Sequence, residues 1–164
     1  MDKNQINFTP RAQKIVKDAK LEAHKLRQEA AGLEHLFLAF LNVQNSEINE
    51  ILEDLGIDTS ELKQIVLQNL NKGEFEFEDS TKVSYTTSIR KALTESRKLA
   101  LRLKHSFVSC EHLFYSFLKM PNCPAIEFFD MLEIDTKEIL NRLTSRKSPT
   151  AKRRQNSSVS FFCR

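Results

Sequence analysis

Apolar positions along this chain recur with the period of amphipathic helices. A first stripe runs through residues 9–30, at Ile15, Val16, Ala19, Ala23, Leu26 and Ala30. A second, within 32–41, places Leu33, Leu36, Phe37, Phe40 and Leu41 at i, i+3, i+4, i+7 and i+8. Such stripes are typical of helices that turn one face towards a core. The pattern predicts a first helix, a second that begins near Gly32, and a third over roughly 47–55.

Residues with special roles at helix ends support these boundaries. Thr9 is a favourable N-cap, and Pro10 follows it at the first helical position, where a missing N–H removes no helical hydrogen bond. Gly56 suits the position just after a helix C-terminus. Asp58 and Glu61 have the spacing of a capping box, which predicts a fourth helix from this point.

The four-helix pattern occurs a second time, 77 residues later. Residues 32–41 match 109–118, with Glu34 corresponding to Glu111. The same offset, without a gap, matches 8–9 with 85–86 and 57–59 with 134–136. Since a gapless match over about 60 residues is hard to produce by chance, the chain contains an internal duplication. The helices of the second copy are expected to begin at Thr86, Ser109, Pro124 and Asp135.

The duplication predicts an all-α domain of two tandem four-helix repeats. Each unit alone is too small to bury its apolar faces, so the two are expected to pack together with pseudo-twofold symmetry. Residues 73–79 alternate apolar and charged side chains, as a short strand would, but no partner strand is evident and we interpret them as a linker. The expected boundaries are 8–71 for repeat one, 72–84 for an acidic linker and 85–143 for repeat two, within a domain of 1–143 followed by a tail of 144–164.

The composition is that of an ordinary soluble chain, with 40% apolar and 29% charged residues. No apolar run approaches the roughly 18 residues of a membrane span, and residues 1–8 lack the apolar core of a secretory signal. Three cysteines, Cys110, Cys123 and Cys163, are an odd number without paired spacing. They predict free thiols in a reducing compartment, either the cytoplasm or an organelle stroma.

The net charge of +3 is unevenly distributed. Residues 144–164 contain six basic residues and no acidic one, which leaves a net charge of −3 for residues 1–143. The tail has no helical period and is expected to be disordered. Six positive charges on such a tail bind phosphates without specificity, so no specific nucleic acid is expected as a partner.

Several of these segments resemble a known family. Phe-Thr-x-x-Ala at 8–12, the Ala-rich helix after it, Gly-x-Glu-His-Leu at 32–36 and Leu-Gly-Ile at 55–57 are similar to the double Clp repeat. That repeat is the N-terminal domain of Clp ATPases, the unfoldases that feed the Clp protease or remodel aggregates. The resemblance covers residues 4–143 and is strongest to the ClpC type. It implies a module that recognises substrates or adaptors, with no catalytic residue and no cofactor.

The chain departs from the family pattern in two ways. No G-x-x-x-x-G-K-[ST] phosphate loop occurs, so ATP hydrolysis by the family mechanism is not expected. The chain is then either a stand-alone repeat protein or part of a longer one. Family members often carry Thr before the Glu of the second helix, whereas this chain has Leu33 and Cys110 there.

The resemblance also implies candidate site residues. In ClpC-like domains the Glu matching Glu34 and Glu111 binds the guanidinium of phosphoarginine, and the matching Thr with nearby amides holds the phosphate. The carry-over pairs Thr9 with Glu34 in copy one and Thr86 with Glu111 in copy two. Helix N-termini bind anions, and a carboxylate can form a forked pair with a guanidinium. The alternative is that each Glu only stabilises a helix end.

Other reactive side chains indicate no chemistry. His35 and His112 lack a second His or Cys at ligand spacing, so packing between the repeats is favoured over metal binding. Cys110 has no base nearby in the sequence, and its neighbour Glu111 raises a thiol pKa, so it is not expected to be a nucleophile. A set of phenylalanines is expected mainly in the core, although an aromatic groove between the copies is an alternative: Phe37, Phe40, Phe114, Phe117, Phe128 and Phe129.

Three functions remain open from the sequence. The first is a recognition domain, monomeric in isolation, that brings substrates or adaptors to a Clp chaperone–protease. The second is a stand-alone accessory protein that docks on a Clp complex and modulates its assembly. The third is a sensor of a small ligand or phosphorylated residue unrelated to Clp. An enzyme is the least favoured class, because no nucleophile–base pair, metal cluster or phosphate loop is present in the sequence.

Overall fold

The structure is a computed structural model that describes residues 6–43 and 46–145. Within those residues the chain forms eight α-helices, which confirms the all-α prediction. The first copy contains α1 (Pro10–Lys25), α2 (Leu33–Asn42), α3 (Glu47–Asp54) and α4 (Thr59–Gln68). The second contains α5 (Thr87–Arg102), α6 (Cys110–Leu118), α7 (Pro124–Met131) and α8 (Thr136–Ser145). A 3₁₀ turn, η1 (Ser80–Lys82), and two short strands, β1 (Ala30–Ala31) and β2 (Ser84–Tyr85), complete the fold. The predicted tail, 144–164, lies outside the described residues from 146 onwards.

Each helix of the second copy begins 77 residues after its counterpart in the first. The pairs of first residues are 10 and 87, 33 and 110, 47 and 124, and 59 and 136. The backbone after the first helix also repeats, because Arg27 and Lys104 both have positive φ angles, of 56° and 62°. The tandem four-helix repeats predicted from the sequence are therefore present in the structure.

The predicted capping residues begin their helices. Thr9 Oγ1 accepts a hydrogen bond from the Ala12 amide at 3.2 Å. Its counterpart, Thr86 Oγ1, accepts one from the Ile89 amide at 3.3 Å. Asp58 Oδ1 accepts one from the Ser60 amide at 2.9 Å. Each bond satisfies an amide that has no partner within its own helix.

The two copies exchange their N-terminal segments. Strand β2 of copy two pairs in parallel with β1 of copy one, and Thr86 donates its amide to the Ala31 carbonyl at 3.0 Å. In the same way Phe8 of copy one forms a parallel bridge with Val108 of copy two, and Thr9 donates to the Val108 carbonyl at 2.9 Å. These reciprocal bonds relate the copies by pseudo-twofold symmetry.

The linker lies against the end of α1. Residues 73–79 contain no strand, in agreement with the interpretation from the sequence. Gly73 donates its amide to the Leu26 carbonyl at 2.7 Å, and Arg27 forms an ion pair with Glu76 at 2.7 Å. A Cβ at Gly73 would lie 2.2 Å from the Arg27 carbonyl oxygen, so this approach requires glycine.

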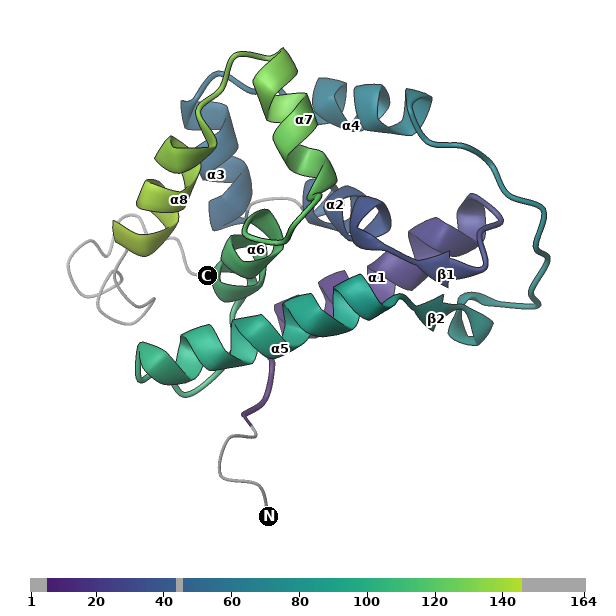
Figure 1. Cartoon of the computed structure of the whole chain (residues 1–164), viewed down its shortest axis with the longest axis horizontal. Helices are drawn as coiled ribbons and strands as arrows, with labels where there is room; N and C mark the ends of the chain where they lie inside the picture. Colours follow the sequence, from purple (N-terminus) through teal and green to yellow (C-terminus); the bar gives the residue numbers. More distant parts are fainter. Residues whose placement is uncertain (1–5, 44–45, 146–164) are drawn as a thin grey trace.

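The core lies where α2 and α6 meet at the centre of the molecule (Figure 1). The long helices α1 and α5 cover one side of this pair, and the four short helices cover the other. Phe40 of α2 packs edge-to-face on Phe114 of α6 with ring centroids 4.8 Å apart, and Phe37 lies 5.7 Å from Phe117. All four rings are buried, which confirms that the phenylalanine stripe is mainly core.

Gly56 and its counterpart Glu133 both have a positive φ angle, which is less favourable for glutamate than for glycine. Gly56 has φ of 85°, and Glu133, which occupies the same place after α7, has φ of 58°. Because a side chain is disfavoured in this left-handed region, we expect Glu133→Gly to raise the free energy of unfolding by about 0.5–1 kcal/mol. Denaturant titration measures this change. The matched control, Gly56→Ala, should lower stability by a similar amount, and an unchanged midpoint for Glu133→Gly would contradict the expectation.

Candidate functional site

The structure brings the candidate Thr and Glu residues together across the two copies. Thr86 lies beside the N-terminus of α2, where a Cβ at Gly32 would be 2.5 Å from Glu34 Oε1 and 3.6 Å from Thr86 Cγ2. Thr9 is bound to Val108, in the segment that leads into α6 and Glu111. The pairing expected from the sequence, Thr9 with Glu34 and Thr86 with Glu111, is therefore corrected. The exchange of N-terminal segments between the copies is the physical reason.

Thr86 and Glu34 line one cavity of about 610 Å³. It is lined by the first turn of α2, the C-terminal end of α4 and residues of α7. The polar groups include the Glu34 carboxyl and the hydroxyls of Thr86 and Ser88, and the apolar wall includes Val66, Leu70, Phe128 and Met131. Met131 is 65% exposed, so the apolar wall continues to the surface. The cavity therefore offers the carboxyl groups of Glu34 and Glu127, hydroxyl donors and an apolar flank to a ligand.

Glu111 has a different environment from its counterpart Glu34. It lies near Glu47, the first residue of α3, and Glu47 is 9% exposed. Burial acts to raise the pKa of Glu111, but the hydrogen bonds from Glu47, the backbone and Ser109 outweigh it and lower the pKa.

Cys110 is not activated at this position. Burial, and next the charge of Glu111, raise the pKa of its thiol to about 12. A thiol at this pKa is almost fully protonated at neutral pH and is a poor nucleophile.

His35 and His112 hold the starts of the central helices. The Nδ1 atom of His35 accepts a hydrogen bond from the Gly32 amide at 2.9 Å, and that of His112 accepts one from the Ser109 amide at 2.8 Å. Burial lowers the pKa of both rings, to about 4 for His112, to which the nearby His105 also contributes. Over residues 6–43 and 46–145 no three His, Cys, Asp or Glu side chains gather as a metal site.

Two contacts were not evident from the sequence. His105 Nδ1 lies 2.7 Å from His112 Nε2, and Glu47 contributes to the lowered pKa of Glu111. Both join residues from different helices or loops, and neither pair has a spacing that signals contact. The repeat does not reveal them either, because Gln28 and Pro124 occupy the positions that correspond to His105 and Glu47.

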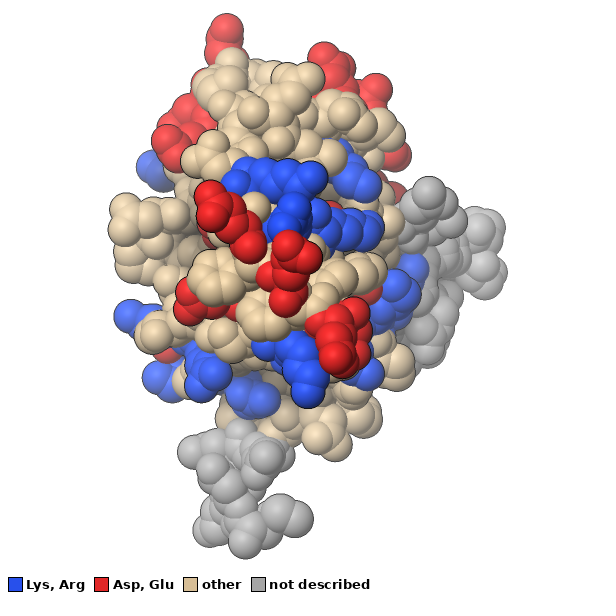
Figure 2. All heavy atoms as spheres, turned by 90° about the vertical axis from the view of Figure 1, so that its right-hand side faces the viewer, with Lys and Arg blue, Asp and Glu red and all other residues tan. Residues whose placement is uncertain are grey.

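The surface near the linker carries charges of both signs. Figure 2 shows acidic and basic side chains interspersed on the face that carries the linker and the strands, without a large area of one sign. None of the helices in the described part of the chain is both long and apolar enough to cross a bilayer.

Comparison with known proteins identifies relatives of this chain. A family model described as the Clp repeat N-terminal domain matches residues 7–132. A probable ATP-dependent Clp protease ATP-binding subunit of Chlamydia pneumoniae is 30% identical over 132 residues, which cover 80% of this chain and 16% of that protein. The negative regulator of genetic competence ClpC/MecB of Bacillus subtilis is 29% identical over 68% of this chain and 14% of its own length. The chain thus spans about a sixth of the length of these relatives.

Solved structures have the same fold. The N-terminal domain of the caseinolytic protease associated chaperone ClpD from Arabidopsis thaliana has a TM-score of 0.68 and 15% identity, over 85% of this chain and 94% of that one. The Hsp104 N-terminal domain from Candida albicans has a TM-score of 0.69 and 19% identity, over 84% and 89%. In Clp ATPases this all-α domain is a non-catalytic module for protein interaction. By the match of its family model over most of its length, the chain belongs to the Clp repeat N-terminal domain family.

Proposed function

We propose that this chain recognises substrate proteins or an adaptor for a Clp chaperone–protease, and that it binds a phosphoarginine side chain at Glu34 and Thr86. The observation that carries this proposal is the cavity in which these two residues meet at the N-terminus of α2. The recognition role follows the family, and the phosphoarginine ligand follows the resemblance of the two Glu-His-Leu segments to ClpC-type domains.

The groups in the cavity suit both halves of such a ligand. The Glu34 carboxylate can pair with a guanidinium through two parallel hydrogen bonds. The first turn of α2 and the hydroxyls of Thr86 and Ser88 suit the phosphoryl oxygens, because helix N-termini attract anions. The apolar wall of Val66, Leu70 and Met131 can receive the rest of an extended peptide. We place the protein in the cytoplasm or an organelle stroma, where thiols such as those of Cys110 and Cys123 stay free.

Glu34→Gln tests the ligand. We expect it to weaken binding of a short peptide with one phosphoarginine by roughly 30-fold or more, because the amide removes the charge that pairs with the guanidinium. Isothermal titration calorimetry measures the affinity. Glu127→Gln, at another carboxyl of the same cavity, is the matched control and should change affinity by less than about threefold. If the unmutated protein binds neither this peptide nor its unphosphorylated form, the phosphoarginine proposal is wrong.

An accessory protein that docks on a Clp complex is the second candidate. The exposed side chains of Met131 and Leu132 at the end of α7, 65% and 41% exposed, favour it because they offer an apolar contact next to the cavity. Affinity purification with mass spectrometry separates the candidates. Recovery of the proteolytic ring without substrates or adaptors supports the accessory role, and recovery of adaptors or phosphorylated substrates supports the recognition role. Ligand binding without any Clp partner would indicate an unrelated sensor.

A further inference from the structure

We propose that the C-terminal end of α5, with Leu103, Lys104 and Phe107, is a docking surface for an extended segment of a partner protein that contains a glycine followed by alternating acidic and aromatic residues. This chemistry is inferred from the chain's own linker, which covers the symmetry-related end of α1. None of the three residues lines the cavity at Glu34, so the proposal goes beyond the proposed function and does not depend on phosphoarginine binding.

The ends of α1 and α5 have the same backbone. Arg27 and Lys104 each donate an amide to the carbonyl three residues earlier, at 3.0 Å in both copies. Gln28 and His105 each donate to the carbonyl five residues earlier, at 2.9 Å in both copies. The carbonyl groups at the end of α5 are therefore held in the same way as their counterparts at the end of α1.

In copy one these carbonyl groups bind the linker. The amides of Gly73 and Phe75 donate to the carbonyls of Leu26 and Arg27, at 2.7 and 3.0 Å. The Arg27 guanidinium then pairs with Glu76 at 2.7 Å. Alternate amides of the linker thus bond to the helix end as an added strand would, and the charge of the next residue reinforces the contact.

In copy two the same position is open within the part of the chain that the structure describes. Leu103 is 47% exposed and Phe107 is 53% exposed, whereas Leu26, the counterpart of Leu103, is packed against the core. No backbone amide among residues 6–43 and 46–145 bonds to the carbonyl of Leu103 or Lys104. In Figure 1 this end of α5 lies on the side of the molecule opposite to the linker. The surface therefore offers apolar side chains together with two carbonyl acceptors.

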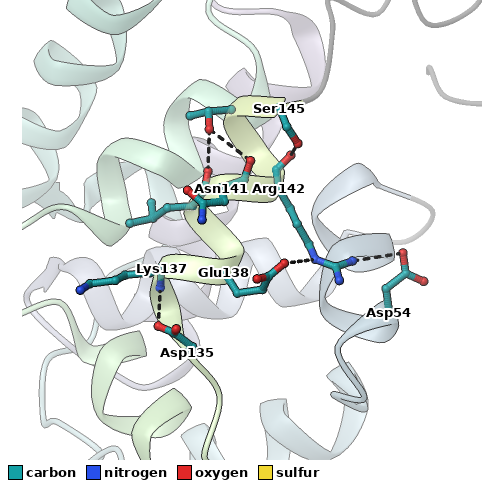
Figure 3. A network of polar contacts seen from close by, with 9 residues as sticks. Asp54, Asp135, Lys137, Glu138, Asn141, Arg142 and Ser145 are labelled. Atoms are coloured by element: carbon teal, nitrogen blue, oxygen red, sulfur yellow. Dashed lines mark hydrogen bonds and ion pairs between the residues drawn. The ribbon is translucent and has the colours of Figure 1, made fainter.

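The duplication would place the segment after α8 at this surface. Helix α8 ends at Ser145, which corresponds to Gln68 at the end of α4. Figure 3 shows this last turn, in which Ser145 Oγ donates to the Arg142 carbonyl at 3.2 Å while Arg142 pairs with Glu138. The positions that correspond to linker residues 71–79 are 148–156, which lie outside the described residues.

The sequence at those positions does not have the chemistry of the linker. Thr150 stands at the position of Gly73, where a Cβ would lie 2.2 Å from a backbone carbonyl oxygen. Arg153 stands at the position of Glu76, so it would meet Lys104 as a like charge. Both differences disfavour this segment as the occupant, and they leave the surface to another chain.

The charge around the end of α5 favours an acidic occupant. Residues 96–110 contain four Lys and Arg residues and no Asp or Glu. Lys104 corresponds to Arg27, the residue that pairs with the linker, and is itself exposed. Acidic residues of a partner would meet this charge, while its aromatic residues would contact Leu103 and Phe107.

A synthetic peptide of residues 71–79 is the probe, added at millimolar concentration to the full chain and followed by NMR of the backbone amides. We expect it to shift the resonances of residues 101–107. Phe107→Ala and Leu103→Ala should each weaken the affinity by roughly tenfold, because apolar anchors supply most of the binding free energy at such surfaces. Leu132→Ala, at a leucine that is 41% exposed after α7, is the matched control and should change the affinity by less than about twofold.

Two altered peptides test the chemistry of the occupant. The probe with Gly73→Ala should lose binding because of the close approach to the backbone. A peptide of residues 148–156 should not bind. Equal binding of that peptide would assign the surface to the chain's own tail, and a dimer that Phe107→Ala dissociates in sedimentation would assign it to a second copy. Either result, or shifts absent from residues 101–107 or confined to residues 24–28, would overturn the proposal.

Discussion

Replacement of Phe37 by alanine is expected to lower the free energy of unfolding by about 3–5 kcal/mol. The ring is fully buried and lies 5.7 Å from Phe117, 6.1 Å from Phe128 and 6.0 Å from Phe129. All three neighbours belong to the second copy, so the substitution leaves a cavity where the copies meet. Since small domains are stable by about 5–15 kcal/mol, this loss is a large fraction of the total stability.

Thermal and denaturant unfolding followed by circular dichroism measure this loss. Phe107→Ala is the matched control, because that ring is 53% exposed, and it should change stability by no more than about 0.5 kcal/mol. The Phe37→Ala variant should still unfold in one transition, since the core is shared between the copies. Two separate transitions, or a loss below about 1 kcal/mol, would contradict a single core that joins the repeats.

The helices and their first residues could be predicted from the sequence because N-cap residues and apolar spacing act over only a few residues. Thr9 and Asp58 bond to amides two or three residues away, so the bond that begins each helix is visible in a short stretch of sequence. The repeat reinforces each prediction, since Thr86 and Asp135 are caps at the same places in the second copy. Apolar spacing then identifies the buried face of each helix.

The arrangement of the copies could not be predicted in the same way. A duplicated sequence is equally consistent with Thr–Glu pairs within a copy and between copies, because both arrangements have identical residue types. The parallel pairings that decide between them involve only two residues per strand or a single bridge. Such short segments carry no alternation of apolar and polar residues, so β1 and β2 left no pattern to detect.

In the sequence, these local differences between the copies show only as different residues at matched positions. Glu47 opposite Pro124, and His105 opposite Gln28, are changes at positions that no motif includes. What each change means depends on a neighbour outside its own helix, Glu111 in one case and His112 in the other. The spacing of these residues along the chain does not show that they lie close together.

The hydrogen bonds of His112 fix the tautomer of its neutral ring. Nδ1 of His112 accepts the Ser109 amide hydrogen, so it carries no proton, and the neutral ring must have its proton on Nε2. Nε2 can then donate to Nδ1 of His105 at 2.7 Å. A second proton on His112 would occupy Nδ1 and remove the acceptor for the Ser109 amide at the start of α6. His112 must therefore stay neutral for this capping bond to persist.

Stability is accordingly expected to fall as the pH decreases from about 6.5 to about 4. Burial and the charge of His105 lower the pKa of folded His112 from 6.5 to about 4. In this window the unfolded chain binds a proton that the folded chain excludes, so acid favours unfolding. A shift of this size corresponds to a loss on the order of 3 kcal/mol, complete below the folded pKa. Denaturant titrations at several pH values measure how the free energy of unfolding changes with pH.

His112→Gln should flatten this slope, because glutamine can still accept the Ser109 amide hydrogen but does not titrate in this range. His35→Gln is the matched control. His35 is also buried with a lowered pKa, but it has no histidine opposite, and the carboxylates of Glu34 and Glu22 favour its charged form and offset part of the burial. The control should therefore flatten the slope less. An equal effect of the two substitutions would assign the acid sensitivity to burial alone, whereas an unchanged slope in His112→Gln would exclude the His105–His112 pair as its source.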